Sequence, residues 1–194
     1  MRRKMKRIGF AALMICAIIV LLLVRPDFEI GRYDSLPEAM DKAVPYEINN
    51  IIHIGLFDGV TAVMYTTDPD KKQLPFAEHE VLAAAFFKGD EEKGRASIGG
   101  HSWMHYENEN LTVYDEYLRD DDEQGNSLHE RHVVFGEINN PDIIKVETSV
   151  IGKEVFEEAR IIEHKGQRYY FDIGGGTVVR GLSAHGEVLD RQGG

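Results

Sequence analysis

The sequence predicts a mainly β protein with minor α content. An N-terminal transmembrane helix and one short helix come first, followed by antiparallel strands in two small lobes, the second a β-sandwich. Three observations predict this class. An uncharged apolar run fills residues 8–24, and a single helix-capping pattern follows it. Most of the remaining chain alternates apolar and polar residues between regularly spaced turn signals.

The N-terminal segment has the features of a membrane anchor. Residues 1–7 carry five positive charges, and the apolar run at 8–24 ends at Arg25. At about 1.5 Å per helical residue the run spans roughly 25 Å, close to the ~30 Å hydrocarbon core of a bilayer. The positive-inside rule keeps the basic flank cytoplasmic and makes residues 26–194 extracytoplasmic. We therefore expect a single-pass protein of the cell membrane, in contact with the lipid bilayer through residues 8–24.

Two other interpretations of this segment differ in processing. A cleaved signal peptide needs small residues where the apolar region ends, whereas this chain reads "LLLVRPDF" there. A lipoprotein needs a small residue before its acylated cysteine, but Cys16 follows Ile15 and lies inside the apolar run. An uncleaved anchor is favoured, and a cleaved signal stays open as the alternative.

The chain after residue 25 is strongly acidic. It holds all 33 acidic residues and sixteen of the 22 basic ones, so its net charge is near −17. Such a surface repels a phosphate backbone, which excludes general electrostatic binding of nucleic acid. Cys16 is the only cysteine, so the exported part has no disulfide and must rely on its own hydrophobic core.

The first lobe is predicted over residues 34–118, after a connector at 26–33. Ser35 and Glu38 form a capping-box pattern at the start of a short helix. Apolar, β-rich runs follow it, and the first two are joined by Asp58-Gly59, a dipeptide typical of tight hairpins. These runs are "IIHIGLF", "VTAVMYTT", "EVLAAAFFK" and "LTVYDEYL".

The second lobe is predicted over residues 131–194. An acidic loop, "RDDDEQGNSLHE" at 119–130, is expected to separate it from the first lobe. Short strands with turn signals between them then favour a small β-sandwich, and His164-Lys165-Gly166 indicates one of its hairpins. The strand candidates include "HVVFGEI", "IIKVETSVIG", "QRYYFDI" and "TVVRGLS".

The strand-and-turn pattern of this second lobe resembles a known group of proteins. The stretches "FGEINNPDIIKVET", "ARIIEHKGQRYYFDI" and "VRGLSAHGEVLD" are similar to those of small, uncharacterised membrane-anchored proteins of Gram-positive bacteria. The likeness is closest in the C-terminal part of the chain. It implies architecture alone, an N-terminal anchor followed by a β-rich exported domain.

Two histidine pairs are candidate metal ligands. His101 and His105 are four residues apart, which places both imidazoles on one face of a helix. On a strand the pair would be about 13 Å apart, and the preceding Gly99-Gly100 does not favour a helix. His129 and His132 could join a distant carboxylate in holding a metal ion, or they begin a strand.

Asp120 and Asp122 would add oxygen ligands to such a site. They occupy the first and third positions of a loop whose sixth position is Gly125, as in calcium-binding loops. The twelfth position is Arg131, where an EF-hand requires a bidentate Glu, so that pattern fails. A solvated acidic loop is the favoured interpretation.

Trp103 and Tyr106 form a candidate ligand surface. Aromatic side chains at this spacing could line a groove for a sugar or a peptide, although they also suit a core or an interface between the lobes.

The sequence contains no motif of an established catalytic site. It lacks G-x-S-x-G and H-E-x-x-H, and no Lys-Ser or Lys-Thr follows the glycines at 174–176. We therefore predict a non-catalytic binding or interaction module of the cell envelope, without a cofactor and with an envelope or membrane protein as its partner. The alternative is a metal-dependent envelope enzyme or metal-binding protein that uses the four histidines and two aspartates named above.

Overall fold

In the part of the chain that the structure describes, the protein is mainly β with one short helix, as the sequence predicts for these residues. The computed structural model describes residues 31–69, 72, 80–101, 105–122, 124–174 and 176–193. The helix in these ranges is α2 (Leu36–Ala43). The strands are β1 (Arg32–Tyr33), β2 (Asn50–Phe57), β3 (Val60–Thr67), β4 (Val81–Asp90), β5 (Gly94–Gly100), β6 (His105–Glu107), β7 (Thr112–Asp121), β8 (Ser127–Glu137), β9 (Lys145–Ser149), β10 (Glu157–Glu158), β11 (Arg160–His164), β12 (Gln167–Ile173), β13 (Val178–Leu182) and β14 (Val188–Gln192).

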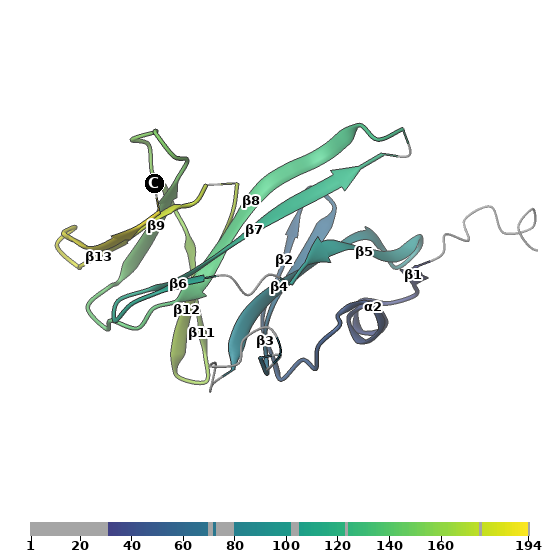
Figure 1. Cartoon of the computed structure of the whole chain (residues 1–194), viewed down its shortest axis with the longest axis horizontal. Helices are drawn as coiled ribbons and strands as arrows, with labels where there is room; N and C mark the ends of the chain where they lie inside the picture. The colour runs from purple at the N-terminus through teal and green to yellow at the C-terminus, as the bar shows by residue number, and fades with distance from the viewer. Residues whose placement is uncertain are drawn as a thin grey trace, which may run out of the picture.

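The strands form three antiparallel sheets. The N-terminal sheet has the order β1-β5-β4-β3-β2, the central sheet β11-β12-β8-β7-β6 and the C-terminal sheet β10-β9-β13-β14. In Figure 1 the long β7–β8 hairpin lies between α2 with its sheet on one side and β9 with β13 on the other. The layers formed by the described residues are thus one helix followed by three sheets.

Three hydrophobic cores hold these layers together. Met40 of α2 packs with Tyr65 and Phe87 on the outer face of the N-terminal sheet. The other face of that sheet meets the central sheet, around Phe86 and Phe135. The third core lies between the central and C-terminal sheets. Its members include Val113, Val134, Ile143, Val146, Tyr170 and Val179.

β3 and β4 do not alternate between buried and exposed residues, because both faces of their sheet are covered. Every residue of β3 is buried, and so are the first seven of β4. One set of side chains in each strand points to α2 and the other set points to the central sheet. Because both faces are covered, these strands read as continuous apolar runs, a pattern otherwise typical of parallel sheets.

The predicted helix start and two predicted hairpin turns are confirmed. The N–H of Glu38 donates to the Ser35 hydroxyl at 3.3 Å, while the Glu38 carboxylate accepts from the N–H of Asp34. Asp58 (φ 46°) and Gly59 (φ 82°) form the two-residue turn between β2 and β3. Lys165 and Gly166 form the same kind of turn between β11 and β12. Two successive positive φ values are the signature of the type I′ hairpin.

The structure differs from the acidic loop expected at 119–130. β7 continues to Asp121 and β8 begins at Ser127, so most of this range is paired strand. The physical reason is a long-range contact, because Asp120 of β7 forms an ion pair with Lys88 of β4 at 2.8 Å. The ion pair offsets the cost of burying the Asp120 carboxylate, whereas the sequence alone predicts that this carboxylate lies in solvent.

Strand pairing also crosses the expected division between residues 34–118 and 131–194. β7 lies mainly in the first range and β8 mainly in the second, yet the two pair along most of their length in the central sheet. The central and C-terminal sheets share a hydrophobic core in the region where the second lobe was expected. That core includes Val113 of β7, and the other face of the central sheet packs on the N-terminal sheet.

The predicted transmembrane segment at 8–24 lies outside the described residues. In the ranges that the structure describes, no helix is long and apolar enough to cross a bilayer.

Candidate functional site

The structure places His101 and His105 against different cores. Nδ1 of His101 is hydrogen-bonded to the Tyr65 hydroxyl at 2.9 Å, in the core beneath α2. The His105 ring stacks on Tyr114 with centroids 4.7 Å apart, beside the core between the N-terminal and central sheets. Its Nε2 lies 3.6 Å from the Glu107 carboxylate. The two imidazoles therefore have separate partners.

His129 and His132 lie on β8 and have opposite orientations, because residues three apart on a strand face opposite sides. Nδ1 of His132 lies 3.1 Å from the Asp115 carboxylate. His129 pairs in register with Asp120, but that carboxylate contacts Lys88 instead. These contacts do not bring the two histidines to one site.

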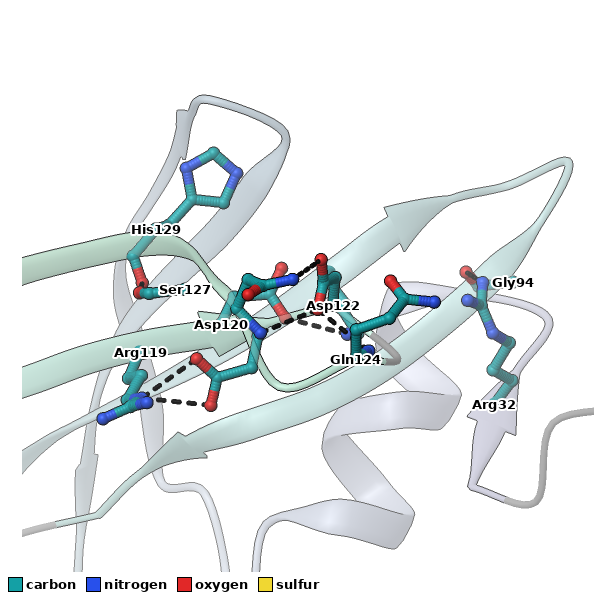
Figure 2. A network of polar contacts seen from close by, with 11 residues as sticks. Arg32, Gly94, Arg119, Asp120, Asp122, Gln124, Ser127 and His129 are labelled. Carbon is teal, nitrogen blue, oxygen red and sulfur yellow. Dashed lines mark hydrogen bonds and ion pairs between the residues drawn. The ribbon is translucent and has the colours of Figure 1, made fainter.

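Asp122 organises the turn of the β7–β8 hairpin. Its carboxylate accepts hydrogen bonds from the backbone N–H groups of Gln124 and Asn126, at 2.9 and 2.8 Å, and from the Asn126 side chain. The bonds from Asn126 hold the pKa of this carboxyl below its ordinary value. In Figure 2 the imidazole of His129 points away from this carboxylate.

The predicted metal ligands are therefore distributed over several separate contacts. Among the described residues, no three His, Cys, Asp or Glu side chains are placed to hold a metal ion together. Of the predicted aromatic surface, Trp103 lies outside the described residues. Tyr106 lies on β6 and is 72% exposed, at the edge of the central sheet.

A different surface, on the edge strand β2, stands out by comparison with the other edges. Proteins protect sheet edges by making them short or charged. β1, β6 and β10 have two or three residues each, and β11 and β14 carry charged side chains. β2 has eight residues, "NIIHIGLF", none of them Asp, Glu, Lys or Arg. No described strand pairs with its outer edge.

Three large apolar side chains of β2 are exposed in a row. Ile51 is 44% exposed, Ile54 48% and Leu56 76%. A β-bulge between Ile51 and His53 shifts the register against β3, so residue 51 shares a face with residues 54 and 56. That face is the one covered by α2 further along the sheet, since Ile51 and Ile54 lie opposite Tyr65 and Val63.

A groove of about 450 Å³ lies between this row and α2. It is mainly apolar, with two acidic side chains. The lining residues are Leu36, Pro37, Met40, Asp41, Tyr46, Glu47, Ile48, Ile51 and Ile54. Its volume falls in the range that protein ligands commonly occupy. We refer to the outer edge of β2 together with this groove as the β2 surface.

Two partly buried histidines pack next to the β2 surface. His53 faces the central sheet from β2 and its ring packs edge-on against Phe171, at 5.3 Å between centroids. His101 packs edge-on against Tyr46, which lines the groove. Burial lowers the pKa of both imidazoles, and nearby Arg160 lowers that of His53 further.

We expect low pH to destabilise the folded protein through these two histidines. Unfolded chains take up a proton at the ordinary histidine pKa of 6.5, whereas folded His53 and His101 do so only at lower pH. In that interval the unfolded state binds more protons, so the free energy of unfolding falls as the pH drops below 6.5. Urea unfolding between about pH 7.5 and 5.5 measures the slope. His53→Phe should flatten it, and His185→Gln, a substitution on an exposed turn, serves as the control. An unaltered slope in His53→Phe would contradict this account.

No known protein family, curated protein or solved structure matches this chain.

Proposed function

We propose that this chain is a membrane-anchored, non-catalytic binding module of the cell envelope, and that it binds an extended segment of a partner protein along β2. One observation carries the proposal: β2 is a long, uncharged edge strand whose exposed apolar row borders an apolar groove. An edge of this kind is a template for pairing with another strand.

Strand addition uses both features of the β2 surface. The outer edge of β2 offers backbone N–H and C=O groups, which supply affinity to any extended chain. Alternate side chains of the added strand would point toward α2 and enter the groove beside Ile51 and Ile54. The eight residues of β2 match a strand of ordinary length. Backbone pairing and apolar burial would thus act on the same segment.

The proposed anchor restricts where the partner is found. Ten residues separate the apolar run, which ends at Val24, from Ser35 at the start of α2. Fully extended, they reach at most about 35 Å. Because α2 forms one wall of the groove, the β2 surface would stay near the outer face of the membrane. A membrane protein or another envelope component is the corresponding partner.

Site-specific photo-crosslinking in intact cells tests this function. With a benzoyl-phenylalanine probe at Leu56 of the full-length protein, we expect one discrete crosslinked protein. The same probe at Val155, which is 73% exposed and far from the groove along the chain, is the control. Ile54→Asp should lower the yield by about tenfold, because it removes apolar contact and adds a charge that must be desolvated.

The fold is not expected to limit this experiment. Ile54 is 48% exposed, and substitutions at exposed sites usually change stability by about 0.5 kcal/mol or less. Identical adducts from positions 56 and 155, or a yield that Ile54→Asp does not change, would contradict binding at the β2 surface.

A further inference from the structure

The groove indicates the chemistry of the segment that fills it. We infer that the partner segment carries both apolar and basic side chains on the face that it turns toward α2, and that its basic side chains lie against Glu47 and Asp41. This inference rests on the proposed function and adds to it a class of partner sequence.

The two charged side chains that line the groove, Asp41 and Glu47, are both acidic. Asp41 contacts Lys42 at 2.8 Å, but both side chains are largely exposed, so solvent screens that pair. Glu47 makes no ion pair with any described residue. A cation in the groove would therefore gain a carboxylate without displacing a strong internal partner.

The two carboxylates come from different parts of the groove lining. Asp41 lies on α2 next to Met40, and Glu47 lies in the segment between α2 and β2, next to Tyr46 and Ile48. Side chains on one face of an added strand are about 6.6 Å apart. An apolar side chain can occupy the groove while a neighbouring Lys or Arg lays its methylene stem on Met40 or Tyr46 and directs its charge to a carboxylate.

Charge also favours a basic segment over the other possible occupants of the β2 surface. A second copy of the chain would bring a second domain of net charge near −17, and anionic lipid headgroups would be repelled in the same way. A basic segment is attracted at long range by the same field. Complementary charge therefore selects a basic, apolar polypeptide for the β2 surface.

Selection from a peptide library tests the inference. Random peptides of about ten residues, enough to pair with β2, are displayed on phage and selected on the full-length protein in zwitterionic nanodiscs. We expect the enriched sequences to place Lys or Arg two positions from an apolar residue, so that both side chains lie on the face turned toward the groove. Their binding should weaken about tenfold in Glu47→Lys and remain within about twofold in Glu154→Lys, which reverses an exposed charge after β9.

The outcomes distinguish the inference from the function on which it rests. Enriched peptides that are neutral or acidic, yet lose binding in Ile54→Asp, would overturn the partner chemistry and leave the proposed function standing. Peptides that bind Ile54→Asp as well as wild type would overturn both.

Two further results would assign the β2 surface to another occupant. A full-length dimer dissociated by Ile54→Asp would assign the surface to a second copy. Leu56-dependent binding of anionic vesicles would assign it to lipid. Either result would overturn the inference.

Discussion

Gly136→Ala is expected to destabilise the protein by at least about 3 kcal/mol. Gly136 lies on β8, between β7 and β12 of the central sheet. A Cβ atom there would lie 1.7 Å from the carbonyl oxygen of Thr112 and 2.8 Å from the ring of Tyr170. The Tyr170 hydroxyl donates a hydrogen bond to that same carbonyl at 2.9 Å. The missing side chain thus allows Tyr170 to cross β8 and reach β7.

Gly55→Ala is the matched control for this substitution. Gly55 also lies in a strand, but its added Cβ would meet only the far end of the His53 ring, at 3.1 Å, which a small rotation relieves. We expect it to cost no more than about 1 kcal/mol. Urea unfolding of the full-length protein, followed by circular dichroism, compares the two variants. Equal losses of stability would contradict the close approach inferred at Gly136.

Lys88→Met is expected to destabilise the protein by about 3 kcal/mol, because it leaves the Asp120 carboxylate unpaired. Only 6% of the Asp120 side chain is exposed, and Lys88 contacts it at 2.8 Å. Asp120→Leu should cost less, since 33% of the Lys88 side chain is exposed and its ammonium group can move toward solvent. The double variant should recover much of the loss, as buried ion pairs replaced on both sides often do.

The exposed pair Lys42–Asp41 provides the control for Lys88→Met. The contact distance is the same, 2.8 Å, but the two side chains are 60% and 69% exposed. Lys42→Met should therefore leave the stability of the protein almost unchanged. If Lys88→Met and Lys42→Met have equal effects on urea unfolding, burial of Asp120 does not control the strength of the Lys88 contact.

The features that the sequence predicted well are local. Asp58-Gly59 predicts a hairpin because a type I′ turn requires positive φ at two successive residues, and few residue pairs adopt it. Ser35 predicts the start of α2 because its hydroxyl satisfies a backbone N–H that the helix leaves free. Each of these signals depends only on neighbours within a few positions along the chain.

The arrangement of the sheets depends on long-range pairing and was not predicted. A continuous apolar run such as "VLAAAFF" does indicate burial on both faces, and that was the available signal for stacked sheets. The strand at 119–121 was missed because its compensating contact, Lys88, is distant in sequence. Composition alone cannot distinguish an acidic strand end from an acidic loop.

The β2 surface was missed for two physical reasons. The bulge after Ile51 breaks the strict alternation of "NIIHIGLF", so the sequence does not reveal that residues 51, 54 and 56 share a face. Whether a strand is central or at an edge is decided by which strands pair with it. The absence of charged residues in β2 indicates a binding edge only when the strand is known to lie at the edge of its sheet.

The position of β8 in the central sheet has a consequence for how the chain folds during synthesis. β8 pairs with β7, which precedes it in the chain, and with β12, which follows it. The central sheet is therefore incomplete until residue 173 has been synthesised. A nascent chain that ends near residue 140 would have a bare β8 edge and one uncovered apolar face, a combination that promotes aggregation. Folding is therefore expected to be late and cooperative, without a stable N-terminal half.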